Sequence, residues 1–275
     1  MKKKILIPVI LLLLGVFLYS AWNVVGTLLE YREGQNFYEN LEQYVDTPNQ
    51  ESNAAKKSKL PLLFQTKGPT VPVLSETDDY PQINVDFDAL REINDDVVGW
   101  IYIPDTEINY PVLQGEDNDQ YLYHLLTGAY NGSGSIFLDA GVASDFSGKN
   151  SPVYGHNMKN GSMFAGLMDY KSQEFFDQHP KAYLMTPEKN YVVHLFSGYV
   201  IDTWSNAWDM VFADGKFGEW LRDLQSRSCF STTVIPEEDD CVLTLSTCSY
   251  EVTEGRFVVH GVLEEYTTET QDTAD

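Results

Sequence analysis

The sequence has few basic residues and few cysteines. Only 18 Lys and Arg stand against 41 Asp and Glu, which gives the 275 residues a formal net charge of −23. Nucleic-acid-binding proteins need a basic face to displace counterions from phosphates, so we expect no nucleic acid as a partner. The chain also lacks the polybasic surface of a peripheral membrane protein. Its 3 cysteines exclude a scaffold built from disulfides.

The sequence also lacks the residue spacings that are typical of metal sites. The sequence contains no Cys-x-x-Cys and no His-x-x-x-His spacing, which argues against structural zinc, and no acidic cluster suggests a calcium site. We therefore expect no metal and no other cofactor. The sequence shows no internal repeat. Hydrophobic residues nevertheless make up 43% of the chain, close to the share in globular proteins, so this is not a disordered acidic chain.

One long apolar run stands at the N-terminus. Lys2, Lys3 and Lys4 precede Ile5–Val25, which carries no charge and is long enough to span a bilayer as a helix. Lysines on the short side favour a cytoplasmic N-terminus. A cleaved signal peptide is the alternative, but its apolar core is shorter, at about 7–15 residues. No second run of this length exists, so we predict a single-pass plasma-membrane protein whose main part is extracellular.

Composition divides the chain into four regions. They are a cytoplasmic tip and membrane anchor over 1–25, a helical stalk and proline-containing linker over 26–84, a β-rich domain over 85–266, and an acidic, disordered tail over 267–275. Within the stalk, the apolar spacing of Thr27–Tyr44 predicts that the membrane helix continues. Prolines then recur from 47 to 81, which indicates a linker. Asp86 is expected to cap a short helix over Phe87–Ile93.

From Val97 onward the sequence consists of short β-branched and aromatic runs separated by turn residues. This texture predicts an all-β barrel or sandwich. The predicted strands are 98–104, 108–114, 135–140, 151–155, 182–187, 191–201, 241–247 and 256–266. Helical patterns interrupt them at Asn118–Leu126, Ser162–Tyr170 and Phe217–Gln225, and the last is amphipathic.

Cys248 has the most suggestive setting of the three cysteines, because it ends an apolar strand and leads into a loop. Cys229 and Cys241 are interpreted as small packing residues, and a disulfide between them remains open. A reactive thiol needs a neighbouring cation or base to lower its pKa. His156 also follows a strand end. Arg256 opens the strand after Cys248, so a hairpin would bring its guanidinium beside the thiol.

These residues carry a family resemblance. Thr244-Leu245-Ser246-Thr247-Cys248 resembles the TLxTC signature of sortases, the membrane-anchored cysteine transpeptidases of Gram-positive bacteria. The segments 154–158 around His156 and 255–260 around Arg256 match the same family in the same order. The resemblance covers about residues 85–266. A helical segment between His156 and Cys248, and no C-terminal membrane helix, make the chain similar to class B.

The resemblance implies a closed β-barrel of about eight strands with N-terminal helices, peripheral helices and one long inserted helix. It implies that Cys248 attacks a sorting signal after Thr, that His156 transfers protons, and that Arg256 stabilises the oxyanion or holds the substrate. The implied partners are surface proteins with a C-terminal sorting signal and an amine of the peptidoglycan cross-bridge or its precursor. Arg256 alternatively forms an ion pair with Glu251 or Glu254.

Further residues match positions that touch the sorting peptide in class B. They are Asn118, Leu122, Tyr154 and Ser246, and each has an alternative as a packing residue. Three other functions stay open at this point. A pilin-polymerising sortase would use a lysine acceptor, and a cell-surface binding module would keep the barrel without catalysis. A papain-like hydrolase would place its cysteine before its histidine, whereas here Cys248 follows His156.

Overall fold

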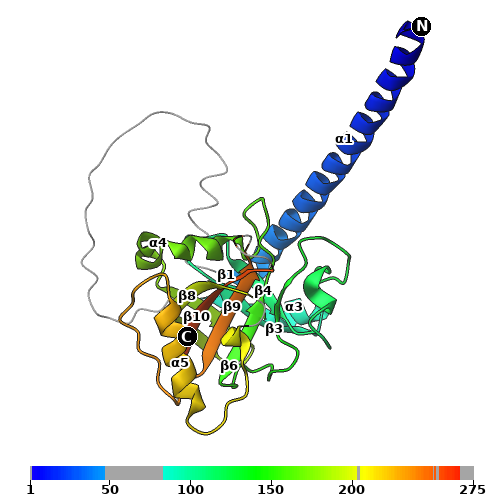
Figure 1. The fold of residues 1–275 in the computed structure, drawn as a ribbon. Coiled ribbons are helices and arrows are strands. Elements are labelled where there is room, and N and C mark those ends of the chain that lie inside the picture. The colour runs from blue at the N-terminus through cyan, green and yellow to red at the C-terminus, as the bar shows by residue number, and fades with distance from the viewer. Residues whose placement is uncertain (1, 47–82, 203–204, 250, 252–253, 267–275) are drawn as a thin grey trace, which may run out of the picture.

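The computed structural model describes residues 2–46, 83–202, 205–249, 251 and 254–266 (Figure 1). The linker expected over 47–81 and the tail expected over 267–275 lie outside these ranges. The chain begins with one continuous helix, α1 (Lys2–Leu41), followed by a 3-10 turn, η1 (Glu42–Tyr44). The prediction that the apolar run and the stalk form a single helix is therefore confirmed.

Helix α1 has two unlike halves. Its large apolar side chains between Ile10 and Leu29 are exposed, and the helix is long and apolar enough to cross a membrane. Tyr38 and Leu41, near its end, are instead buried against the body of the protein. Figure 1 shows the first half of α1 projecting away from the remaining elements. A short pairing of β1 (Val45–Asp46) with β2 (Asn84–Val85) follows.

The body is a closed barrel of eight strands in the order β10-β8-β7-β3-β4-β5-β6-β9. Neighbours are antiparallel except for the β4–β5 and β6–β9 pairs, which are parallel. All eight strands predicted from the sequence are present. Their bounds are β3 (Val97–Tyr102), β4 (Asn109–Leu113), β5 (Ile136–Leu138), β6 (Asn150–Tyr154), β7 (Lys181–Met185), β8 (Asn190–Ile201), β9 (Val242–Cys248) and β10 (Arg256–Tyr266).

Only some of the predicted helices are present as α-helices. Helix α3 (Phe87–Ile93) has the expected bounds, and the Asp86 side chain caps it by accepting from Ala89 N at 2.9 Å. Helix α5 (Lys216–Arg227) is the expected insertion between β8 and β9, and it buries the apolar face of its amphipathic sequence. The remaining short elements are η2 (Gln120–Leu122), η3 (Ala165–Lys171), α4 (Gln173–Gln178) and η4 (Asn206–Trp208).

Two segments with helical patterns form 3-10 turns and not α-helices. The pattern over Asn118–Leu126 yields only the three-residue η2, because the backbone beyond it turns into a hairpin: Leu125 N donates to the Ala129 carbonyl and Asn131 N to the Tyr123 carbonyl. The pattern over Ser162–Tyr170 yields the 3-10 segment η3. That segment contains Gly166, a poor helix former, and 3-10 geometry is common in such short connections.

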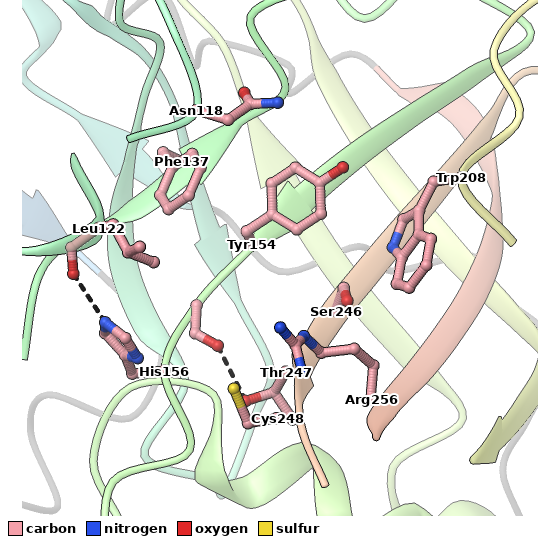
Figure 2. Close-up of a pocket in the computed structure, with 11 residues that line it drawn as sticks. Asn118, Leu122, Phe137, Tyr154, His156, Trp208, Ser246, Thr247, Cys248 and Arg256 are labelled. Atoms are coloured by element: carbon pink, nitrogen blue, oxygen red, sulfur yellow. Dashed lines mark hydrogen bonds between the residues drawn. The ribbon is translucent and has the colours of Figure 1, made fainter. Parts of the chain in front are cut away.

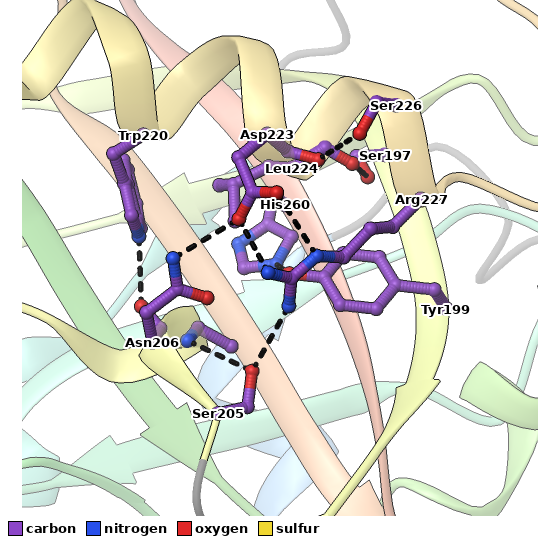
Figure 3. Close-up of polar contacts among 11 residues, drawn as sticks. Ser197, Tyr199, Ser205, Asn206, Trp220, Asp223, Leu224, Ser226, Arg227 and His260 are labelled. Atoms are coloured by element: carbon purple, nitrogen blue, oxygen red, sulfur yellow. Dashed lines mark hydrogen bonds and ion pairs between the residues drawn. The ribbon is translucent and has the colours of Figure 1, made fainter.

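A polar network joins α5 to the loop that precedes it (Figure 3). Asp223 pairs with Arg227 at 2.5 Å and accepts from the Asn206 side chain at 3.0 Å. Asn206 in turn accepts, through its backbone carbonyl, from the Trp220 indole N–H at 2.7 Å. Arg227 also donates to the Ser205 hydroxyl at 3.4 Å. Helix α5 thereby fixes the start of η4, which borders the pocket described next.

Candidate active site

Strand register brings the three residues of the motif to one end of the barrel. Strands β6 and β9 are parallel with Tyr154 opposite Ser246. His156 and Cys248, each two residues further on, therefore lie side by side at this end of the two strands. Strands β9 and β10 are antiparallel with Cys248 opposite Arg256. The hairpin expected from the sequence is therefore present.

Hydrogen bonds hold the two strand ends together. The Gly155 N–H donates to the Ser246 carbonyl at 3.1 Å, and the Thr247 hydroxyl donates to the Gly155 carbonyl at 2.8 Å. Beyond the strands, the Asn157 amide donates to the Cys248 carbonyl at 2.8 Å. The backbone next to the thiol is thus bonded to residues on both sides of the imidazole, which limits their relative movement.

The glycine before His156 is required by packing. A Cβ atom at Gly155 would lie 2.4 Å from Cδ1 of Ile136 and 2.8 Å from the ring of Phe164. Both neighbours are buried core residues with no room to move aside. The turn that carries His156 out of β6 therefore admits no side chain at this position.

These strand ends border a pocket of about 300 Å³ (Figure 2). Its lining contains every site residue expected from the sequence. The full set is Asn118, Leu122, Phe137, Tyr154, Gly155, His156, Trp208, Ser246, Thr247, Cys248 and Arg256. Cys248 is partly exposed, so its thiol is accessible from the pocket. In the part of the chain that the structure describes, no cluster of His, Cys, Asp or Glu is arranged to hold a metal ion.

One hydrogen bond fixes the protonation pattern of His156. Its Nε2 lies 2.7 Å from the Leu122 carbonyl oxygen, which can only accept, so Nε2 carries a hydrogen. The remaining nitrogen, Nδ1, is turned to the side of Cys248 (Figure 2). The Tyr123 ring packs against the imidazole with centroids 5.6 Å apart. Nδ1 is therefore the atom available for proton exchange with the thiol.

The Leu122 carbonyl is itself supported by the segment up to Ser135. Gly134 has a φ of 56°, and a Cβ there would lie 2.4 Å from the Leu122 oxygen. The buried Tyr38 hydroxyl of α1 donates to the Gly134 carbonyl at 2.7 Å and lies 2.8 Å from the Ser135 hydroxyl. The end of α1 thus contacts the segment that orients His156.

The guanidinium of Arg256 is held by backbone rather than by the acids considered from the sequence. Its Nη1 donates to the carbonyls of Glu254 and Gly255 at 3.1 and 3.0 Å. Glu251 pairs instead with Lys171. One edge of the Arg256 fork is thereby fixed while the group lines the pocket.

Asp139 organises one wall of the pocket and was missed by the sequence analysis. Its buried carboxylate accepts from the Tyr154 hydroxyl at 2.8 Å and from the Asn118 amide at 2.9 Å. Burial, together with the Asp139 charge, raises the pKa of Tyr154 well above its usual range, so the phenol stays protonated. Tyr154 and Asn118 are thus coupled through one acid that precedes a loop and belongs to no recognisable motif.

Trp208 was also missed, because it lies in a loop far from the three motif segments. The Asn150 side chain donates to the carbonyls of Ala207 and Asp209, at 3.3 and 3.0 Å, and so holds the backbone on both sides of the indole. Thr244 donates to the Asn150 side chain at 2.6 Å. These hydrogen bonds connect β9, β6 and the segment that carries Trp208, and they can be seen only in the folded structure.

The other two cysteines and the buried His260 lie outside the pocket. Cys241 is half-buried, whereas Cys229 is exposed, so its interpretation as a packing residue was wrong. All three cysteines are free thiols, so the disulfide left open between Cys229 and Cys241 is absent. Burial raises the pKa of both of these thiols, which keeps them protonated. His260 is fully buried, and burial lowers its pKa to about 3. It lies 2.9 Å from the Thr244 hydroxyl and takes no part in the pocket.

Comparison with known proteins agrees with this geometry. A family model described as the sortase domain matches residues 101–264. Sortase B of Listeria monocytogenes is 33% identical over 261 residues, which cover 92% of this chain and 94% of that protein. The chain belongs to the sortase family. Sortase B of Staphylococcus aureus is 28% identical over 94% of this chain and 96% of its own length.

The fold comparison points to the same class of sortase. The structure titled Staphylococcus aureus sortase B-substrate complex matches with a TM-score of 0.69 and 27% identity, covering 87% of this chain and all of that one. Class B, suggested by the sequence motifs, is therefore confirmed. The protein is a sortase B-type cysteine transpeptidase with a closed eight-stranded barrel.

Proposed function

We propose that this sortase cleaves a C-terminal sorting signal after Thr, holds the protein as a thioacyl intermediate on Cys248, and transfers it to an amine of the peptidoglycan cross-bridge or its precursor. The observation that carries the proposal is the strand register, which sets Cys248 opposite Arg256 and beside His156 on one pocket. The similar structure titled as a sortase B-substrate complex supports a sorting-signal substrate for this chain at a coarse level.

The geometry supports a two-step proton path. In the first step the Cys248 sulfur attacks the Thr carbonyl, its proton having passed to Nδ1 of His156, and the imidazolium then protonates the leaving amine. In the second step the incoming amine attacks the thioester, the C–S bond breaks, and the amine's proton passes through Nδ1 to the released Cys248 sulfur. The Leu122 carbonyl holds Nε2–H throughout. Arg256 is always charged, so it acts by stabilising negative charge on the carbonyl oxygen.

The proposed placement has residues 5–25 crossing the plasma membrane, the N-terminus inside and the barrel outside. The exposed apolar half of α1 supports it. The regions 1–25, 26–84, 85–266 and 267–275 then serve as anchor, stalk and linker, catalytic barrel and tail. Asn118, Leu122, Tyr154 and Ser246 are proposed to contact the sorting peptide, because all four line the pocket.

The test uses the full chain in detergent with a library of quenched sorting peptides. We expect cleavage after Thr, and an amine-ligated product when a glycine peptide or cross-bridge amine is added. Cys248→Ala should abolish both products, whereas Cys229→Ala, the matched control, should leave both unchanged. If Cys248→Ala cleaved the peptides as fast as the parent protein, the proposed mechanism would be wrong. A peptide lysine that outcompetes cross-bridge amines would identify a pilin-polymerising enzyme instead.

A further inference from the structure

The second notable uncharged stretch of the sequence lies beside α1. Between Asp119 and Asp139 the chain carries no Asp, Glu, Lys or Arg, although 41 acids are spread over the sequence. No longer stretch without these residues occurs after the N-terminal apolar run. An acidic surface is repelled by anionic lipid headgroups, whereas an uncharged one is not.

This stretch runs along α1 toward the membrane end of the helix. Ser135 lies beside Tyr38, as described above, and the Gly132 N–H donates to the Glu30 carboxylate at 2.7 Å. The Asn131 amide also donates to the Glu30 carbonyl, at 3.1 Å. Eight helical residues separate these two contacts, which is about 12 Å along the axis. Of the two contacts, the one at Glu30 is nearer to the apolar half of α1. The residues that precede Asn131 in the chain adjoin this contact.

The level of that contact relative to the bilayer follows from helix geometry. Glu30 lies five residues beyond Val25, or about 7.5 Å along the helix past the end of the uncharged run Ile5–Val25. The headgroup layer on each side of a bilayer is about 5–7 Å thick. Gly132, which bonds Glu30, consequently lies at about the outer edge of the headgroup layer.

The residues before Asn131 form a hairpin with exposed aromatic rings. The Asn131 N–H donates to the Tyr123 carbonyl at 3.0 Å, and Leu125 N donates to the Ala129 carbonyl at 2.9 Å. Tyr130 is 72% exposed and Tyr123 is 45% exposed, and the two rings stack with centroids 6.3 Å apart. Tyrosine is favoured at membrane interfaces, because its ring is apolar and its hydroxyl is polar.

We propose that the hairpin Tyr123–Asn131 docks on the outer-leaflet headgroup region of the membrane that α1 crosses. The proposal rests on the membrane placement given under the proposed function. It goes further, because it assigns the barrel a fixed orientation on the bilayer in addition to a tether. Tyr123 packs on His156. On this proposal the part of the pocket rim at His156 lies beside the docked hairpin, close to the membrane surface.

The test measures contact between position 130 and lipid. Tyr130→Trp adds an indole in the hairpin, and Val211→Trp adds one at a 92% exposed site just before α5, which lies at the opposite end of the body from α1 (Figure 1). Each full chain is reconstituted into phosphatidylglycerol vesicles with and without bromine on the acyl chains near the headgroup. After subtraction of the parent signal, we expect at least twofold quenching of the added emission at position 130 and no quenching at position 211.

The parent protein provides the internal control for the anchor. Trp22 lies on the exposed half of α1, so bromolipid must quench part of the parent emission if α1 is inserted. Absence of that quenching would overturn the membrane placement itself. Quenching in the parent without any at position 130 would overturn docking alone. Emission at position 130 that responds to soluble sorting peptide but not to bromolipid would make the hairpin a wall of the substrate groove, which also contradicts the proposal.

Discussion

At the scale of single residues, the site depends on fixed orientation of two side chains. One carbonyl, from Leu122, holds Nε2 of His156 and leaves Nδ1 for chemistry. Two carbonyls, from Glu254 and Gly255, hold one edge of the Arg256 guanidinium. A planar guanidinium holds its five N–H donors in a rigid fork, so bonds at one edge set the direction of the others, whereas an ammonium is a point charge with three donors on a flexible stem.

Arg256→Lys tests this difference. We expect a loss of about 10²–10³-fold in kcat despite the retained charge, because a flexible ammonium does not reproduce the rigid fork that aims N–H groups at the oxyanion. The measurement is peptide cleavage with Arg256→Ala in parallel, together with thermal unfolding of each variant. A lysine variant with parent-like kcat would show that charge alone suffices.

His156→Ala tests the proton path. Removal of a general acid and base lowers rates by about 10²–10⁴-fold, and we expect a loss in that range in kcat. His179→Ala is the matched control, since this ring packs on Phe175 away from the pocket. Equal losses in the two variants would show that the effect is not specific to the site.

The residues in motifs could be predicted from the sequence, whereas those that act through backbone or through a fold contact could not. Cys248, His156 and Arg256 stand in segments with a recognisable order. The role of Leu122 rests on its carbonyl oxygen, which is the same atom in every residue type. Asp139 is one of many acids, and only the folded structure brings it to Tyr154.

At the scale of elements, the eight strands were predictable because apolar and β-branched runs are bounded by turn residues. The segment from Asn118 to Leu126 was not, because backbone pairing with Ala129 and Asn131 and the later packing of Gly134 on the Leu122 carbonyl decide its shape. That segment, supported by Tyr38, connects helix α1 to the imidazole of His156.

Two glycines allow this connection to be tested. Gly134 and Gly128 both have positive φ, at 56° and 79°, so alanine strains the backbone at each. A Cβ at Gly134 meets the Leu122 oxygen, whereas at Gly128 it meets nothing within 4 Å. We expect Gly134→Ala to lower kcat at least tenfold more than Gly128→Ala, measured on sorting peptide. Equal effects would mean that the Leu122 carbonyl position is unimportant.

At the scale of the whole molecule, a buried polar chain crosses the barrel to the pocket. His260 of β10 contacts Thr244 of β9, Thr244 donates to Asn150 of β6, and Asn150 holds the backbone around Trp208. Thr244 donates its only hydrogen to Asn150, so His260 must donate from Nδ1. A neutral and a charged imidazole both carry this hydrogen, so it is burial that favours the neutral form of His260.

The pKa of His260 gives a pH-dependent stability. Its value of about 3 in the folded protein lies below the ordinary value near 6.5, so below about pH 6.5 the unfolded chain binds a proton that the folded chain does not. Because of this group, the free energy of unfolding falls by about 1.4 kcal/mol for each unit that the pH is lowered between about pH 6 and pH 3. His260→Asn keeps a donor near Thr244 but does not titrate.

We expect urea unfolding of His260→Asn in detergent to depend less steeply on pH by that amount between pH 6 and 4. The carboxylates contribute equally to both proteins and cancel in the comparison. Parallel pH profiles for the two proteins would show that His260 is not held neutral.

The central claim, a thioacyl intermediate on Cys248, is tested most directly by mass spectrometry. The full chain is incubated with a sorting peptide without an amine acceptor, quenched in acid and digested. The account predicts that the peptide containing Cys248 gains the mass of the substrate up to its Thr, less one water, and that adding the amine removes this adduct. Turnover without any adduct on Cys248, or with an adduct on Cys229 or Cys241 instead, would contradict the account.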